Sequence, residues 1–443
     1  MSDVAICNAG MNAAVDNGHS ANRLQVAAGL ARRYAAERRF KACGIFAVCF
    51  ALFCLAVLLT TIVGTGTSAF LRTDIRLEML LAADVIDPQG ARDLQELSTA
   101  DYRTPVRQAM AALLPAVQNR ADQRQLFDMV SSGAEFYVRD AVMGNPSLIG
   151  GRLTIRVPIS DDLDQYNKGY ISADAAESDR RVSDKQIGWF RTLKEQGLIE
   201  TNFNTTLFTA GDSREPELAG IRSAVVGSFF TMLVTLALAF PLAVMSAVYL
   251  EEFAPKNRWT QLIEVNINNL AAVPSIVFGL LGLAVVLNVF GVPRSAPLAG
   301  GIVLALMTLP TIIIAARAAL KSVPPSIREA ALGLGASPLQ TVLDHVLPLA
   351  MPGILTGTII GMARALGETA PLLMIGMVAF IVDVPQSVLD PATALPVQVY
   401  LWADSPERAF VERSSAAIMV LLAFLFVMNA LAVVLRKRFE RRW

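Results

Sequence analysis

Apolar runs long enough to cross a membrane alternate with polar stretches along this chain. The first run covers residues 44–63 and is followed by a long polar stretch. About 20 apolar residues in a helix span the hydrocarbon core of a bilayer. Five further runs of this kind are expected at about 221–250, 268–290, 298–320, 353–381 and 414–435. The pattern therefore predicts six membrane-spanning helices and no seventh.

The polar stretch at 67–220 has the composition of a soluble domain. Helix-like periodicity predicts helices at 76–98, 104–132 and 183–197. A two-residue alternation at 153–157 predicts a strand between them. We expect a small α+β domain inserted between the first and second spans.

Composition supports a membrane protein and excludes several other classes. Of the 443 residues, 54% are hydrophobic and only 17% are charged, which is unusual for a soluble protein. The formal net charge is zero, so nothing indicates a nucleic-acid partner. The four cysteines all lie within the first 54 residues and there are only two histidines, so neither a disulfide framework nor a metal site is expected.

The distribution of charge predicts the orientation in the membrane. Residues 1–43 end in a basic segment, and the tail at 438–443 is also basic. Cytoplasmic flanks of membrane helices carry an excess of lysine and arginine, so both termini are expected in the cytoplasm. Residues 44–66 are then a retained first helix rather than a cleaved signal. The 67–220 domain and the acidic 383–413 loop fall outside.

A polar segment at 321–352 separates the fourth and fifth spans and is predicted to form a helix–turn–helix elbow. Pro324 and Pro325 begin the first helix, Gly335 breaks it, and Ser337-Pro338 opens a second helix that Pro348 stops. Such short helices need a partner surface to be stable. Ala330 and Ala331 leave a small-residue surface against which another protein can pack closely.

Two opposite charges stand inside the fifth apolar run. Arg364 lies twelve residues after Pro352, about 18 Å along a helix and near the middle of the membrane. Glu368 is four residues further on, on the same helical face, with Thr369 beside it. Charges at this depth are costly and need a partner. The pair is either a structural ion pair or part of an anion pathway, since a guanidinium matches two phosphate oxygens. Arg317, in the fourth span, is a weaker candidate.

These motifs resemble one family. The spacing of Glu329-Ala330-Ala331, Gly335 and Leu347-Pro348 is similar to the EAA loop of ABC importer permeases. The segments 266–279 and 363–372 are similar to those of the PstA-type membrane subunit of phosphate ABC importers. The chain resembles the subset with an extra extracytoplasmic domain after the first membrane helix. His345 departs from the pattern, where an aliphatic residue is usual.

The resemblance implies an all-α polytopic membrane protein with the type I ABC importer permease fold, its core at 221–437. It implies an inner-membrane phosphate permease that pairs with a homologous second permease, two cytoplasmic ATPase subunits and an extracytoplasmic phosphate-binding protein, surrounded by membrane lipid. In the family the arginine corresponding to Arg364 is implicated in phosphate passage. The family's elbow docks into the ATPase, so the resemblance implies six candidate coupling residues: Glu329, Ala330, Ala331, Gly335, Leu347 and Pro348. The sequence has no nucleotide-binding P-loop and no catalytic constellation, so we expect no enzyme activity and no cofactor in this chain.

Two other functions remain open. The chain could be an ABC permease for another oxyanion, such as phosphonate or molybdate. The first span, outer domain and second span also resemble the arrangement of a membrane sensor, although a sensor needs neither four further spans nor an elbow. The outer domain is either a docking surface for the binding protein or a stabilising or regulatory insertion.

Overall fold

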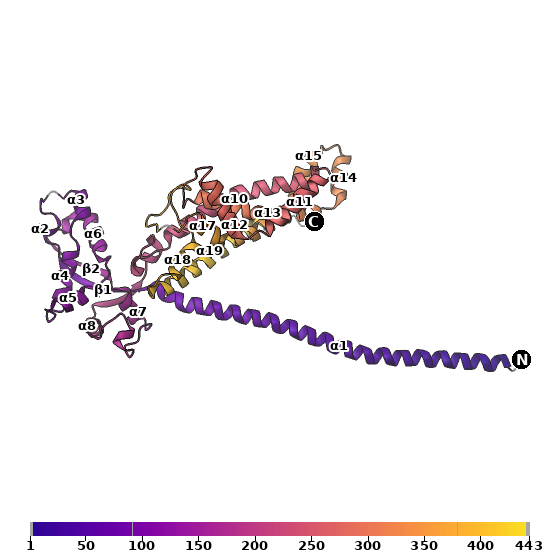
Figure 1. The fold of residues 1–443 in the computed structure, drawn as a ribbon, viewed down its shortest axis with the longest axis horizontal. Coiled ribbons are helices and arrows are strands. Elements are labelled where there is room, and N and C mark those ends of the chain that lie inside the picture. The colour runs from indigo at the N-terminus through magenta and orange to yellow at the C-terminus, as the bar shows by residue number, and fades with distance from the viewer. Residues whose placement is uncertain (1–2, 91, 379, 440–443) are drawn as a thin grey trace. The chain divides into compact units, whose positions relative to one another are not determined.

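The computed structural model describes residues 3–90, 92–378 and 380–439 (Figure 1). Residues 440–443 of the predicted basic tail lie outside the described residues. The chain forms two units, Met1–Thr61 and Ile62–Trp443, and each is described by itself.

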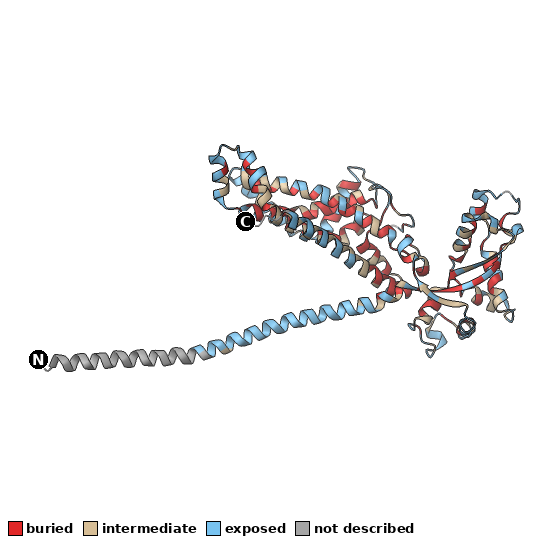
Figure 2. Cartoon of the chain, turned by 180° about the vertical axis from the view of Figure 1, so that it is seen from behind, coloured by how far each residue is buried: buried red, intermediate tan, exposed pale blue. Residues whose placement is uncertain are grey.

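The first unit is helical throughout its described length. Helix α1, Asp3–Gly66, continues without a break through the predicted first span at 44–63. Its described side chains from residue 32 to residue 61 are almost all exposed (Figure 2). Apolar side chains exposed along a helix in this way are suited to burial in lipid or against another protein.

A three-stranded antiparallel sheet organises the first half of the second unit. Its strands are β1 Leu71–Leu80, β2 Arg152–Pro158 and β3 Ile199–Phe203, in the order β2-β1-β3. We call residues 71–203 the sheet domain. Ile75 pairs with Val157 on one side and Ile199 on the other, which places β1 in the centre. Ile75, Leu77 and Met79 are buried in the domain's hydrophobic core.

Short helices complete the sheet domain. They are α2 Ala83–Ile86, α3 Leu94–Thr99, α4 Arg103–Leu113, α5 Arg120–Phe127, α6 Ala134–Gly144, α7 Asp161–Asn167 and α8 Asp184–Glu195. The helix predicted at 183–197 is present as α8, which begins at a capping box formed by Ser183 and Gln186. The strand predicted at 153–157 is also present, as β2.

Two helix predictions in this domain were wrong. The helix predicted at 76–98 is replaced by β1 followed by two short helices, because residues 75, 77 and 79 alternate inward with a period of two. The single helix predicted at 104–132 is divided between α4 and α5.

The second half of this unit, which we call the helical core, is built around helix α13. Its long helices are α10 Arg222–Val248, α13 Pro297–Lys321, α16 Leu347–Leu366 and α19 Ala409–Phe439. The short helices α11 Arg258–Ala271 and α12 Ser275–Leu281 form a pair bent by 104°. Among the described residues, five helices are long and apolar enough to cross a membrane, or six if the bent pair is one span. The predicted architecture, a mostly helical multi-pass protein with a small sheet-containing domain, is confirmed.

The predicted spans differ from the structure in two places. The third is interrupted at Pro274, which cannot donate a backbone hydrogen bond and disfavours helix in the residue before it. The fifth was predicted to reach residue 381, but α16 ends at Leu366 and only the short helix α17, Ala370–Met374, follows. The loop predicted at 383–413 contains a further helix, α18 Leu395–Ala403, which packs on α19.

Candidate functional site

The predicted elbow lies at the end of the helical core that is farthest from the sheet domain (Figure 1). It consists of α14 Pro325–Gly333 and α15 Pro338–Gln340, the latter continuing through a π-helical turn into α16. Gly335, between the helices, has a φ of +89°, a conformation that residues with a Cβ rarely adopt. Ser337 and Gln340 then form a capping box that begins the second arm.

The structure corrects the prediction that Pro348 stops the second arm. Pro348 directly follows the π-helical residues Thr341–Val346, an irregular turn that accommodates the proline, and the helix continues for five further turns. The elbow's second arm and the fifth predicted span are therefore one continuous run, Pro338–Gly367.

The elbow presents most of its candidate residues to the outside. Glu329, Ala330 and Gly335 are exposed, and Leu347 and Pro348 are half-buried. Ala331 is buried within the elbow, so the predicted small-residue contact surface is reduced to Ala330. His345 is exposed and fills no position in the core of the elbow.

Exposed leucines surround these residues. Leu334 is 90% exposed, and Leu332, Leu339 and Leu343 are about half exposed. Exposed apolar side chains on a polar segment are typical of an interaction surface.

A half-buried ion pair fixes the elbow to the helical core. Arg328 donates from Nη2 to Oε1 of Glu252 at 2.6 Å and from Nε to Oε2 at 3.1 Å. The same guanidinium donates to the backbone carbonyls of Val323 and Leu320. The bidentate pairing attaches α14 to the turn that follows α10, and the two carbonyl contacts attach it to the end of α13.

The predicted charged pair is brought together, but at a helix end rather than within a helix. Arg364 lies in the last turn of α16, Gly367 ends the helix, and Glu368 follows in the break before α17. Nε of Arg364 is 3.5 Å from Oε1 of Glu368. The Arg364 side chain is 48% exposed, and among the described residues this long contact is the one the structure gives it.

The break that holds Glu368 and Thr369 packs against helix α12. A Cβ on Gly279 would lie 2.8 Å from Cα of Pro371, so only glycine permits this approach. The segments 266–279 and 363–372, which carry the family resemblance, therefore meet in space. The weaker candidate, Arg317, is paired with Glu264 at 2.6 Å and with Glu251 at 3.4 Å.

Sequence reasoning missed a second polar site, between the linker at 204–221 and α18. Nε1 of Trp402 donates to Oδ1 of Asp212 at 3.0 Å, and burial raises the pKa of Asp212. Gln398 is fully buried beside them. No periodicity connects these residues, which lie about 190 positions apart. Among the described residues, no group of His, Cys, Asp or Glu could hold a metal ion.

Comparison with known proteins identifies the family. Residues 221–443 match the family described as binding-protein-dependent transport system inner membrane component. The chain belongs to this family. It is an ABC transporter permease subunit, a multi-pass membrane protein and not the catalytic subunit. Residues 27–177 of the permease match a second family, described as a domain of unknown function (DUF3333).

Curated relatives resemble the permease at about 30% identity. The phosphate transport system permease protein PstA 1 of Mycobacterium tuberculosis is 33% identical over 224 residues, which are 50% of this chain and 72% of that one. The phosphate transport system permease protein PstA of Haemophilus influenzae is 30% identical over 223 residues, which are 50% of this chain and 78% of that one. The probable ABC transporter permease protein YqgI of Bacillus subtilis is 33% identical over 187 residues, 42% of this chain and 63% of that protein, so the match spans less than two thirds of it. This permease is also similar to a chain in a solved structure of the methionine ABC transporter MetNI, with a TM-score of 0.40 and 17% identity. The match covers 48% of this chain and 95% of that one.

Proposed function

We propose that this permease forms half of the translocation pathway of an ATP-driven importer of inorganic phosphate. The observation that supports it best is the Arg364 guanidinium, half-exposed at a helix break with one long contact at 3.5 Å. A guanidinium that makes one long contact among the described residues keeps donors for two parallel hydrogen bonds to phosphate oxygens. Relatives named as phosphate permeases support the same substrate.

Glu368 is the second residue of the proposed phosphate site. Its side chain is 19% exposed and lies within reach of the guanidinium. The carboxylate orients Arg364 and accepts a hydrogen bond from a protonated phosphate, which a fully ionised sulfate cannot donate. Thr369 adds a hydroxyl at the same break.

The partners proposed are a homologous second permease, two ATPase subunits and a phosphate-binding protein. The exposed leucines of the elbow, with Glu329 and Ala330, are the proposed contact with an ATPase, because an apolar surface of this kind requires a protein partner. In this proposal the elbow and both termini lie in the cytoplasm and the sheet domain lies outside. The basic residues at 436–438 on the last turn of α19 favour that orientation.

Uptake of labelled phosphate into vesicles containing the full assembly tests the proposal. Arg364→Gln removes the positive charge and the planar guanidinium but keeps a polar, hydrogen-bonding side chain. We expect uptake to be lost while assembly and basal ATP hydrolysis persist. Lys321→Gln is a matched control, since this exposed cation lies on another helix and should leave uptake unchanged. Normal uptake by Arg364→Gln would reduce the pair to a structural ion pair.

A permease for another oxyanion is the second candidate, since the guanidinium of Arg364 can bind phosphonate or molybdate in the same way. Competition separates the two: arsenate should inhibit a phosphate importer, whereas molybdate should inhibit a molybdate importer. Family membership as a transport component leaves the sensor hypothesis without support.

A further inference from the structure

Six charged side chains are buried where the sheet domain meets the start of α19. They comprise three cations and three anions, which we call the junction cluster: Arg72, Lys168, Arg413, Asp74, Asp164 and Glu412. None of the six side chains is more than 9% exposed. Buried charges are tolerated only when they are paired and hydrogen-bonded, so this cluster constrains the geometry around it.

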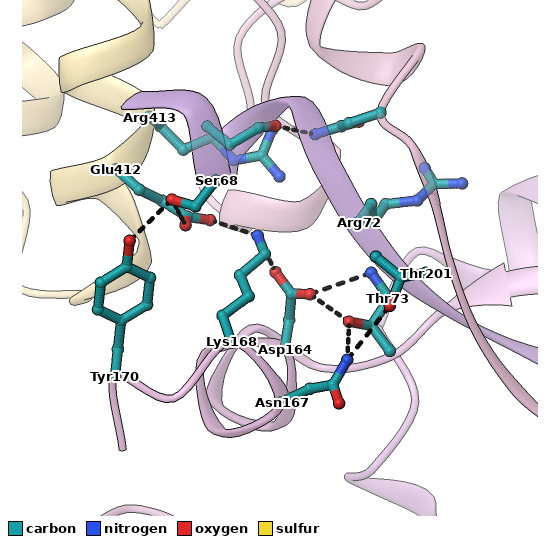
Figure 3. Close-up of polar contacts among 12 residues, drawn as sticks. Ser68, Arg72, Thr73, Asp164, Asn167, Lys168, Tyr170, Thr201, Glu412 and Arg413 are labelled. Carbon is teal, nitrogen blue, oxygen red and sulfur yellow. Dashed lines mark hydrogen bonds and ion pairs between the residues drawn. The ribbon is translucent and has the colours of Figure 1, made fainter. Parts of the chain in front are cut away.

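Lys168 lies at the centre of the junction cluster and joins its two sides (Figure 3). Its Nζ is 2.6 Å from Oδ2 of Asp164, on its own helix α7, and 2.8 Å from Oε1 of Glu412, in the first turn of α19. The other oxygen of Asp164 accepts hydrogen bonds from the backbone N–H and the hydroxyl of Thr73 in β1. The chain of contacts therefore runs from the central strand through α7 to α19.

The segment that leads into the sheet domain is held to the same helix. The hydroxyl of Thr65 donates to that of Ser415 at 2.9 Å. Gly66 packs so closely that an added Cβ would lie 3.0 Å from the backbone of Ser415. The hydroxyl of Ser68 is 2.8 Å from Oε2 of Glu412 and accepts from Tyr170 at 3.0 Å (Figure 3).

The segment that leaves the sheet domain is held there as well. Nη1 of Arg413 donates to the carbonyl of Ala219 at 2.9 Å. Asn204 donates from its backbone to Phe70 and from its side chain to Ala69, which joins the two segments to each other. A small apolar cluster fills the space between them, with the members Ala69, Leu207, Ala219, Ile221, Trp402, Phe410, Ala416 and Ala417.

We propose that the junction cluster fastens the sheet domain rigidly to α19, so that the domain and the last membrane helix move as one body, with Lys168 as the positioning residue. An independently hinged domain needs at least one unattached connection, and here both connections are tied to the first turns of α19. Any force on the sheet domain is then transmitted to a membrane helix of the permease. This inference does not depend on the identity of the substrate.

The charge balance predicts which substitutions loosen the attachment most. Lys168→Met removes the shared cation and leaves Asp164 and Glu412 as buried anions facing each other, which is strongly unfavourable. Glu412→Gln leaves the Lys168–Asp164 pair intact and neutral and removes only the ionic link between Lys168 and α19. The double variant removes one charge of each sign, so it should be less disturbed than Lys168→Met.

Distances measured between spin labels on the full chain in lipid nanodiscs test the inference. The four native cysteines are replaced by serine, and labels are attached at Gln196 in the sheet domain and Asp404 after α18, both exposed. The parent chain should give one narrow distance distribution. Lys168→Met should lose that single peak and Glu412→Gln should broaden it. Lys185→Met is the matched control, because Lys185 is paired with Asp122 on the same domain but is 59% exposed.

Each outcome decides the inference. A distribution that stays narrow in both Lys168→Met and Glu412→Gln would overturn it, since the junction cluster would then contribute nothing to the attachment. If Lys168→Met does not fold, Glu412→Gln alone decides. A broader distance distribution in Glu412→Gln supports rigid attachment through the Lys168–Glu412 ion pair, and an unchanged distribution refutes it. Equal broadening in Lys185→Met would show a general effect of charge and would also refute it.

Discussion

The carboxyl group of Glu217 should make the stability of this permease depend on pH. Glu217 lies in the linker between the sheet domain and α10, is 4% exposed, and its Oε2 atom has no hydrogen-bond partner among the described residues. It lines a cavity of about 400 Å³ together with Asp161 and Glu215. Burial raises the pKa of Glu217 from 4.5 to about 7, with a smaller contribution from repulsion by those two carboxylates, against a lowering hydrogen bond from Ser131.

The sign of the effect follows from proton binding. Between about pH 4.5 and pH 7 the folded chain holds the proton on Glu217, whereas the unfolded chain has released it. The folded state therefore binds more protons, and its free energy of unfolding falls as pH rises through this range. A pKa difference of this size corresponds to about 3 kcal/mol.

Glu217→Gln removes the titration while keeping the shape of the side chain. Thermal unfolding of the full chain in detergent should show equal melting temperatures for the two proteins at pH 4.5. At pH 8 the variant should melt about 5 °C higher. Glu215→Gln is the matched control, because Glu215 lines the same cavity but is exposed, and its pH profile should follow the parent. Parallel curves for the parent and Glu217→Gln would refute the reasoning and would mean that water in the cavity solvates the carboxylate.

Four further substitutions have distinct expected outcomes. Arg364→Lys keeps the charge but loses the planar fork, so phosphate uptake should fall between that of the parent and that of Arg364→Gln. Arg328→Met leaves the Glu252 carboxylate without its cation, so it should lower the free energy of unfolding by about 1–3 kcal/mol. ATP-driven uptake should fall more than assembly, which is measured by co-purification with the ATPase. Gly211→Ala would place a Cβ 1.8 Å from a backbone oxygen and should lower the melting temperature, whereas Gly188→Ala, in an open position on α8, should raise it.

Strong periodicity allowed most of the helical core to be predicted from the sequence. The long apolar runs became α1, α10, α13, α16 and α19, because a span of about 20 apolar residues has few alternatives in a membrane. Local chemistry also predicted the turn at Gly335, where the backbone adopts a positive φ. Sequence patterns therefore predict structure well where one element determines its own boundaries.

Predictions failed where distant residues decide the outcome. Helix-like periodicity predicts a helix at 76–98. Its first part is instead a strand, because β2 and β3, far away in the sequence, pair with it. The same limit applies to Lys168 and Glu412, which are 244 positions apart and share no pattern. Arg364 and Glu368 could be paired from their spacing, but the helix end between them could not be predicted, since Gly367 is tolerated inside many membrane helices.

The continuity of α16 gives the elbow a direct connection to the charged pair. Because Pro348 does not end the helix, one run from Pro338 to Gly367 holds the second arm of the elbow at one end and Arg364 at the other, about 40 Å apart. Along this run Gly353 and Gly357 pack on alanines of α13 so closely that added Cβ atoms would lie 2.6 and 2.2 Å from them. Contacts this close hold this part of α16 firmly against α13. Between it and the elbow the run contains the π-helical residues Thr341–Val346 and the prolines Pro348 and Pro352, where helices bend. We infer that a displacement of the elbow is divided between bending at these positions and movement of the segment that carries Arg364.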